Sequence, residues 1–316
     1  MKVVVLGGAG YLGRPLVRML RELADTVSVS RSTGDGVDEP TDMRRADEVR
    51  DLLTRHRPDV VVVTAYLLDR ASRADPVRAV ETNVLGMTNV FQIAAELGLR
   101  RVVFASSGAV HGVAADFENC ALDESVPCRP TTLYGRMKLF DEWMAEHYNA
   151  RFGTEIVSYR ISGPYGLGKS YARFGGEIPY DTVVTAAGGR GRVVLPWSSD
   201  ARFRFIHVED AAASFLPIIL ADSAAHRVYN APGFTVSVGE LAETARSICG
   251  LDFGFTEPGR PVPFVQWDAS RYEQEFDFRP RPMAGWMQQE IDVLHHRRPA
   301  KETALRQAIE TRVVRP

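Results

Sequence analysis

Two side chains that can act together in proton transfer lie four residues apart in the segment Tyr134-Gly135-Arg136-Met137-Lys138. On a helix this spacing puts the phenol and the ammonium on one face. A free tyrosine titrates at about pH 10, so a tyrosine that works near neutrality needs help, and a neighbouring lysine favours the phenolate. Surface helices also carry this spacing by chance. The pair therefore predicts acid–base chemistry only if a third group joins it.

A hydroxyl that can complete the pair follows a strongly apolar segment. Residues Arg101–Ala105 have the pattern of a buried strand, and Ser106, Ser107 and Gly108 come directly after it. Ligands of open parallel sheets bind at the carboxyl ends of the strands. Ser107 is thus placed to hold a substrate oxygen while Tyr134 moves its proton. A plain serine-rich turn is the alternative interpretation of this segment.

A glycine-rich turn stands at the start of the chain, in Gly7-Gly8-Ala9-Gly10-Tyr11-Leu12-Gly13. It follows a short apolar strand and precedes a helical pattern, which is the context of a dinucleotide-binding turn. Glycines let the backbone turn tightly and approach a pyrophosphate, and the helix N-terminus offers unpaired N–H groups to the phosphates. The turn predicts that the chain binds a dinucleotide cofactor.

The end of the second predicted strand carries Ser30-Arg31-Ser32 instead of the acidic residue that binds the ribose hydroxyls of NAD. A guanidinium between two hydroxyls suits a 2′-phosphate. This segment favours NADP(H). NAD(H) stays an alternative because Asp35 follows closely and can reach the ribose if the loop folds back.

Strand and helix patterns alternate through the first half, which predicts an α/β fold with a Rossmann-type doubly wound parallel sheet. A long helix is expected over Val77–Leu97 and a buried strand over Asp59–Val63. We expect a dinucleotide-binding domain over residues 1–165, its sheet completed by about 203–231. A smaller interleaved substrate-binding region takes 166–202 and 232–298, and 299–316 form a charged tail.

Composition excludes several classes of function. The 316 residues carry a formal net charge of −2, which gives no basic field for nucleic acid. No apolar run approaches the roughly 20 residues that cross a bilayer, and the apolar stretch at the start of the chain is too short for a signal peptide. The three cysteines have no metal-ligand spacing. We expect a cytoplasmic protein with reduced thiols and no metal site.

Together these segments resemble the extended short-chain dehydrogenase/reductase family, also called the NAD-dependent epimerase/dehydratase family. The resemblance runs from Met1 to about Arg297. Besides the motifs above, it rests on five segments: Thr82-Asn83-Val84-Leu85-Gly86, Glu124-Ser125-Val126-Pro127, Arg160–Gly166, Phe205–Asp210 and Asp268–Arg271.

The resemblance implies a role for each matching residue. Tyr134 is the acid/base, Lys138 bonds the nicotinamide ribose, Ser107 holds the reacting oxygen and Asn83 braces the site. The helices beginning near Val77 and Tyr134 match those that build a homodimer. The expected cofactor-binding residues are Gly7, Gly10, Tyr11, Leu12, Gly13, Ser30, Arg31, Ser32, Asp42, Met43, Thr64, Ala65, Tyr134, Lys138 and Ile161. Apart from the resemblance, we expect these residues to bind the substrate: Ser107, Gly108, His111, Tyr134, Arg173, Trp197 and Arg204.

Departures from the family pattern narrow the reaction. Dehydratases of the family carry an Asp-Glu pair after the catalytic hydroxyl, and here Gly108-Ala109 follow Ser107, which argues against dehydration. Nucleotide-sugar epimerases carry an asparagine where this chain has Gly163, and a diphosphate-binding arginine where it has Phe203, although Arg202 or Arg204 can substitute. Their later phosphate clamp is also missing, since Arg260 sits among prolines.

The sequence therefore predicts hydride transfer between a carbonyl and a secondary alcohol on a sugar, sugar acid, polyol or natural product. The alternative is a nucleotide-sugar 4-epimerase with tightly bound NAD. Two other classes fit less well. The match of Gly163–Ser170 to a phosphate loop is followed by glycine-broken chain, not by a helix. A non-catalytic dinucleotide sensor has no reason to keep Ser107, Tyr134 and Lys138 together.

Overall fold

A seven-stranded parallel sheet forms the centre of the computed structural model, which describes residues 1–112, 121–167, 180, 183–184, 192–259 and 264–294. From one edge to the other, the strands are β3 (Glu39–Pro40), β2 (Asp25–Ser30), β1 (Lys2–Leu6), β4 (Val60–Val63), β5 (Arg101–Ser107), β6 (Glu155–Ile161) and β10 (Val228–Asn230). This order reverses at β1 and β4, as in Rossmann-type sheets. The predicted fold class is confirmed.

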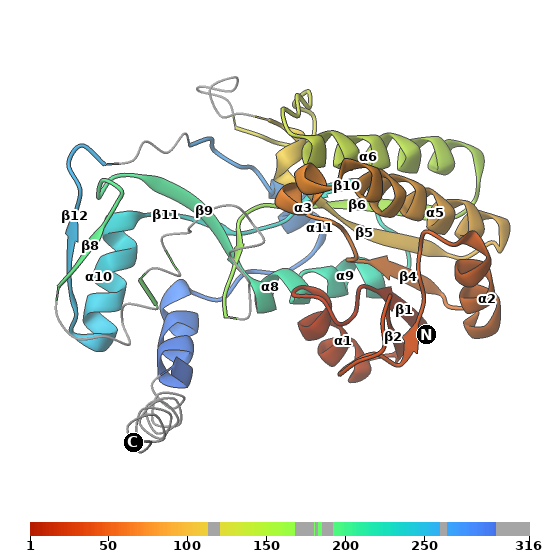
Figure 1. The fold of residues 1–316 in the computed structure, drawn as a ribbon, viewed down its shortest axis with the longest axis horizontal. Coiled ribbons are helices and arrows are strands. Elements are labelled where there is room, and N and C mark those ends of the chain that lie inside the picture. The colour runs from red at the N-terminus through yellow and green to blue at the C-terminus, as the bar shows by residue number, and fades with distance from the viewer. Residues whose placement is uncertain (113–120, 168–179, 181–182, 185–191, 260–263, 295–316) are drawn as a thin grey trace, which may run out of the picture.

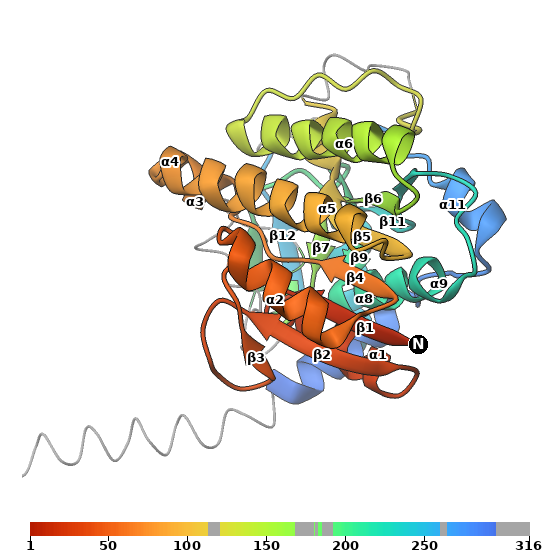
Figure 2. The same ribbon diagram turned by 90° about the vertical axis from the view of Figure 1, so that its right-hand side faces the viewer.

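Helices cover both faces of the sheet (Figures 1 and 2). One face packs on α1 (Gly13–Arg21), α8 (Val208–Ala213), α9 (Phe215–Leu220) and α11 (Ser270–Glu275). The other packs on α2 (Ala46–His56), α5 (Gly86–Glu96) and α6 (Leu133–Arg151).

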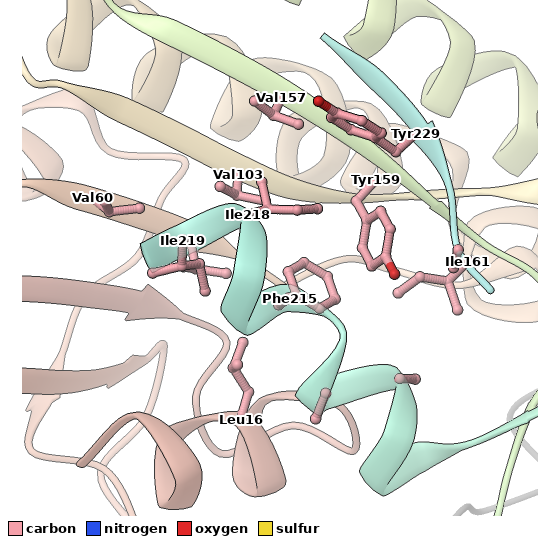
Figure 3. Close-up of a cluster of buried hydrophobic side chains, with 14 of the residues drawn as sticks. Leu16, Val60, Val103, Val157, Tyr159, Ile161, Phe215, Ile218, Ile219 and Tyr229 are labelled. Atoms are coloured by element: carbon pink, nitrogen blue, oxygen red, sulfur yellow. The ribbon is translucent and has the colours of Figure 1, made fainter. Parts of the chain in front are cut away.

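The sheet has a hydrophobic core on each face, the first under α1, α8, α9 and α11 and the second under α2, α5 and α6. Because neighbouring side chains of a strand point to opposite faces, each central strand contributes side chains to both cores. Val60 and Val62 of β4 lie in the first core, and Val61 and Val63 lie in the second. Figure 3 shows Phe215, Ile218 and Ile219 of α9 packed under the strands. Burial on both faces explains why these strands are almost wholly apolar.

The helix predicted over Val77–Leu97 is a succession of three helical segments. It begins with α4 (Pro76–Ala79), which Asp75 caps by accepting a hydrogen bond from the Arg78 N–H at 3.1 Å. It continues as a π-helical turn, η1 (Val80–Leu85), and then as α5. A shorter helix, α3 (Asp69–Ala74), precedes them. Single π-helical turns often occur at functional sites, and this one carries Asn83.

A smaller region packs beside the carboxyl edge of the sheet. It contains a three-stranded sheet of β7 (Pro164–Tyr165), β9 (Arg202–His207) and β11 (Phe234–Ser237). It also contains the parallel pair β8 (Arg192–Leu195) and β12 (Asp252–Phe255), with helix α10 (Val238–Cys249). Within 203–231, only β10 joins the main sheet, whereas β9 belongs to the small one.

Residues 283–294 are also helical. The predicted tail over 299–316 lies outside the described residues. No helix in the described part of the chain is long and apolar enough to cross a membrane.

Candidate active site

Helix α6 presents Tyr134 and Lys138 to the end of β5. Thr132 caps this helix, its hydroxyl accepting a hydrogen bond from the Gly135 N–H at 3.0 Å. Gly135 then allows a close approach, because a Cβ there would lie 2.4 Å from the carbonyl oxygen of Ala109. Ala109 belongs to η2 (Gly108–Val110), the short 3₁₀-helix that follows β5. The cap and the glycine together bring Tyr134 against Ser107.

Tyr134 is hydrogen-bonded to the Ser107 side chain. Burial raises the pKa of Tyr134 to about 12, and the hydrogen bond with Ser107 opposes this rise. The expected lowering of the Tyr134 pKa by Lys138 is therefore absent here. In this state Tyr134 is a neutral phenol at pH 7, which can donate a proton to a carbonyl oxygen.

Lys138 is only 2% exposed, and burial lowers its pKa to about 7. Its Nζ donates to the carbonyl oxygen of Ala105 at 2.5 Å and lies 3.2 Å from the centroid of the Tyr66 ring. The same nitrogen is 5.9 Å from the centroid of the Tyr134 ring. This orientation explains why Lys138 does not lower the Tyr134 pKa in the structure.

The two serines of the pair have different surroundings. Ser106 is buried and donates a hydrogen bond to Oε1 of Glu142, which also forms an ion pair with Arg160 at 2.7 Å. Ser107 lies at the groove, and its Oγ accepts a hydrogen bond from the Ala109 N–H at 3.2 Å. Of the two, the second serine is the one placed to meet a substrate.

A groove of about 1050 Å³ passes over the glycine turn and reaches these residues. Ser107, Tyr134 and Lys138 line it together with Gly10, Thr64 and Ile161. A second hollow of about 360 Å³ continues past Ser30 and Arg31 to Asp42 and Met43. The structure thus brings Ser107, Tyr134, Lys138 and most of the residues predicted to contact a cofactor to one continuous surface.

The glycine turn fits a dinucleotide. Gly7 has φ +94°, and a Cβ there would lie 2.4 Å from the Ala65 nitrogen. A Cβ on Gly13 would lie 2.1 Å from the Gly7 carbonyl oxygen. Gly10, in contrast, is exposed at the groove. Helix α1 begins here with no side-chain cap and no acidic residue in its first turn, so the positive end of its dipole faces the groove without a competing negative charge.

The hollow beyond the glycine turn is lined by Arg31, Arg44 and Arg78, and by one acid, Asp42. The Asp42 carboxylate accepts hydrogen bonds from the Arg44 guanidinium, which lowers the pKa of Asp42. Asp35, the alternative ribose ligand, is exposed and lies 3.7 Å from Arg14. Ser32 also lines the hollow.

The residues predicted to bind the substrate do not all lie at the groove. Gly108 lines the groove, and a Cβ on it would lie 3.1 Å from both Ser162 and Trp267. His111 is buried beside Trp267, with ring centroids 5.8 Å apart, and burial lowers its pKa to about 4.

Arg204 also lies beside Trp267. Its Cζ is 5.2 Å from the centroid of the Trp267 ring, and it donates to the Ala231 carbonyl. Trp197 packs against Phe203 in the core of the small region and does not line the groove. Arg173 lies outside the described residues.

Asn83 supports the groove wall through hydrogen bonds to Leu67, and its amide also donates to the Met137 sulfur at 3.9 Å. Its side chain donates to the Leu67 carbonyl at 2.9 Å and accepts from the Leu67 N–H at 2.7 Å. Leu67 lines the hollow and Leu68 lines the groove. Asn83 is therefore bound to the segment after β4, which is where a bracing residue would act.

Sequence reasoning missed two residues beside Lys138, namely Tyr66 and Asp141. Tyr66 donates a hydrogen bond from its hydroxyl to Oδ2 of Asp141 at 2.8 Å, and its ring meets Tyr134 edge-on with centroids 5.6 Å apart. One signal was available: Asp141 stands three residues after Lys138, on the same helical face. Within the described residues, no group of three or more His, Cys, Asp or Glu side chains could hold a metal ion.

Comparison with known sequences gives a family match. A sequence profile of the NAD dependent epimerase/dehydratase family matches residues 3–231. The UDP-glucose 4-epimerase of Streptococcus mutans is 29% identical over 172 residues, which span 51% of this chain and 51% of that protein. The mitochondrial L-threonine 3-dehydrogenase of Bos taurus is 27% identical over 254 residues, 77% of this chain and 67% of that one.

Comparison with solved structures gives the same architecture. The Thermus thermophilus UDP-glucose 4-epimerase in complex with NAD superposes with a TM-score of 0.73. The match covers 93% of this chain and 99% of that chain, at 22% sequence identity. At this identity the likeness supports the fold.

Proposed function

This chain belongs to the NAD dependent epimerase/dehydratase family, the extended short-chain dehydrogenase/reductase type, and from that premise we propose that it is a dehydrogenase/reductase. The reaction interconverts a carbonyl and a secondary alcohol on a sugar, sugar acid, polyol or natural product. The observation that carries this proposal is the convergence of Ser107, Tyr134 and Lys138 at the groove beside the glycine turn.

Tyr134 and Ser107 act on the substrate oxygen. Ser107 hydrogen-bonds that oxygen and fixes its position, and Tyr134 donates a proton to it in reduction or accepts one in oxidation. Because burial favours the neutral phenol, Tyr134 is ready to donate at pH 7. Lys138, as an ammonium, would donate a hydrogen bond to the nicotinamide ribose of a bound dinucleotide and so hold the dinucleotide beside Tyr134.

The chain also provides the surface for the dinucleotide. Gly10, Tyr11 and Leu12 would hold the pyrophosphate, and Thr64, Ala65 and Ile161 would line the path to the nicotinamide. The nicotinamide ring, when bound, supplies or accepts the hydride. The hollow beyond the glycine turn, which Leu6 and Val29 also line, would take the adenine end of the dinucleotide, and we call it the adenine hollow.

The direct test is turnover. Purified enzyme is mixed with NADP or NADPH, or with the NAD forms, and with a panel of sugars, sugar acids, polyols and ketones. Absorbance of the reduced nicotinamide reports the reaction. Stoichiometric consumption of added cofactor with one substrate supports the proposal, and no turnover with any carbonyl or alcohol contradicts it.

A second candidate is a nucleotide-sugar 4-epimerase, which the similarity to the epimerase of Streptococcus mutans favours. Phe203 argues against it, since this side chain stacks on Phe205 in the core of the small region and offers no charge to a diphosphate. The two candidate functions differ in how the enzyme uses its cofactor. An epimerase carries NAD through purification and needs none added, whereas a dehydrogenase consumes it.

We also propose a preference for NADP(H), and Arg31→Ala tests it. The arginines of the adenine hollow outnumber its acid, and Asp42 is already paired with Arg44. We expect the variant to bind NADPH about 10- to 100-fold more weakly, the cost of a hydrogen bond to a charged group, with NADH unaffected. Quenching of protein fluorescence measures both affinities. The control is Arg45→Ala, outside the hollow. Equal affinities in the parent and an unchanged ratio in the variant would refute the preference.

A homodimer is the proposed assembly. Several large apolar side chains are exposed on α4, η1 and α6, which pack together: Val77, Val80, Leu85, Phe140 and Trp143. Trp143 is 61% exposed. Such an apolar face is typical of a protein–protein interface.

Trp143→Glu is expected to convert the dimer to a monomer, because it places a charge within that face. Sedimentation velocity at micromolar concentration measures the change. Leu220→Glu, on the far side of the sheet at the end of α9, is the matched control and is expected to stay dimeric. A monomeric parent protein would contradict the proposal.

A cytoplasmic location is proposed from composition. Cys128 and Cys249 are both free, as is usual for proteins in a reducing compartment.

A further inference from the structure

A buried charge beside the active site has no part in the mechanism above. Asp141 is 1% exposed and stands on α6 three residues after Lys138. Its Oδ2 accepts the hydrogen bond from Tyr66, and its Oδ1 has no hydrogen-bond partner within the described structure. A carboxylate buried in this way is costly unless another group compensates its charge.

Lys138 is a buried charge of the opposite sign, and it too lacks a charged hydrogen-bond partner in the described structure. Its ammonium is buried, and its one hydrogen bond in the described structure goes to a neutral group, the carbonyl oxygen of Ala105. Its other close contact is the face of the Tyr66 ring at 3.2 Å, a cation–π contact. Without a nearby negative charge, this ammonium would lose its proton more readily.

Tyr66 joins the two charges, because its ring covers the ammonium of Lys138 and its hydroxyl binds the carboxylate of Asp141. The Tyr66 ring also meets Tyr134, so this group of side chains lies against the phenol that moves the proton. We propose that Asp141 is a positioning residue, linked through Tyr66, that keeps Lys138 in its ammonium form beside Tyr134. The expected effect of Asp141 on turnover rests on the proposed function, whereas its expected effect on the pKa of Lys138 does not.

The other charged groups nearby do not replace Asp141. Glu142 also acts on Lys138 from α6, but it is paired with Arg160 of β6. Asp69 of α3 acts on Tyr134 and is paired with Arg73 at 3.0 Å. Asp141 is the charge that acts most strongly on Lys138, and it opposes the lowering of the Lys138 pKa by burial.

The attraction between Lys138 and Asp141 also affects the pKa of Asp141. Burial raises the pKa of Asp141, and the charge of Lys138 opposes that rise more strongly than the hydrogen bond from Tyr66 does. Each buried charge therefore stabilises the other. Removing the carboxylate is expected to lower the Lys138 pKa further, while the direct repulsion between Asp141 and a Tyr134 phenolate disappears.

The chain offers a clean measurement because it contains only four lysines, Lys2, Lys138, Lys169 and Lys301. With lysine labelled by ¹³C at Cε, NMR follows each ammonium through its titration, and Lys138→Arg assigns the signal of Lys138. In Asp141→Asn, the amide oxygen can still accept the Tyr66 hydroxyl bond. We expect the Lys138 midpoint to fall by about one pH unit or more, tenfold in proton affinity.

Two further variants complete the test. Tyr66→Phe keeps the ring over Lys138 and removes the bond to Asp141, and a smaller shift in the same direction is expected. Asp69→Asn is the control and is expected to leave the Lys138 midpoint unchanged. A Lys138 midpoint that stays or rises in Asp141→Asn overturns the proposal. If Asp141→Asn does not fold, the midpoint in Tyr66→Phe decides the question by the same criterion.

Turnover separates this inference from the proposed function. If a carbonyl substrate is found, Asp141→Asn is expected to reduce it at least about fivefold more slowly at pH 7, because a pKa lower by one unit leaves about a fifth of the ammonium form. The loss should diminish as the pH falls, because Lys138 regains its proton, and a loss that is the same at every pH contradicts the role. If no substrate is turned over, the proposed function fails while the NMR titration still decides the role of Asp141.

Discussion

Replacing Tyr134 with phenylalanine is expected to reduce turnover by about 10³-fold, within the range usual for loss of a general acid or base. The change removes only the hydroxyl that is hydrogen-bonded to Ser107. Ser107 can still hold the substrate oxygen, but no phenol is left to give or take its proton. Steady-state rates with NADPH and the carbonyl substrate, measured with parent and variant, test this directly.

The glycine turn and α1 do not depend on Tyr134, so dinucleotide affinity in Tyr134→Phe should stay within about threefold of the parent, under about 0.7 kcal/mol. The matched control is Tyr148→Phe on the same helix, whose hydroxyl donates to Gln92 at 2.6 Å, far along α6 from Ser107. This control should lose about 1 kcal/mol of stability and keep its activity. Equal turnover in Tyr134→Phe and the parent would refute the catalytic assignment.

Local patterns were enough to predict the fold. The apolar runs at β1, β4 and β5 are buried on both faces, which is the reason that their sequence shows no alternation. The glycine turn was equally readable, because Gly7 and Gly13 sit where any Cβ would collide with backbone atoms. Such steric demands act on single residues and leave their mark in the sequence.

Tertiary contacts produced what the sequence did not predict. Trp197 was expected at the substrate site, yet it packs in the core of the small region. The strand β9 was expected near the main sheet, but its pairing with β11 and β7 places it in a separate one. Neither outcome depends on local sequence preference.

The neighbourhood of Lys138 shows the same limit at the level of charge. The spacing of Tyr134 and Lys138 predicted a shared helical face, and the structure has one. The contacts of Lys138 and Asp141 on that face depend on Tyr66, which follows β4 and stands 72 positions before Lys138 in the sequence. Burial then outweighs the expected effect of the lysine on the Tyr134 pKa. The pKa values of buried groups depend on which atoms pack around them, and the sequence spacing of two residues does not specify that packing.

Gly10→Val is expected to weaken dinucleotide binding by at least about 100-fold, or about 2.7 kcal/mol, while leaving the fold nearly as stable as the parent. Gly10 is exposed, and a Cβ on it would have one close neighbour, the Gly7 carbonyl oxygen at 3.0 Å. Its φ is not in the left-handed region, so a side chain costs little backbone strain. The valine would instead extend into the groove at the start of α1, where a pyrophosphate must approach the backbone.

Two other glycine variants separate binding from folding. Gly13→Ala places a Cβ 2.1 Å from the Gly7 carbonyl oxygen and 2.8 Å from the Gly8 Cα, so we expect it to lose roughly 1–3 kcal/mol of stability. Gly153→Val, in an exposed turn with no atom within 4 Å of its Cβ, should change neither quantity by much. Thermal unfolding and NADPH titration of all three variants give both quantities. Since a side chain at Gly10 extends into the groove, undiminished NADPH affinity in Gly10→Val would mean that the groove over the glycine turn is not where the cofactor binds.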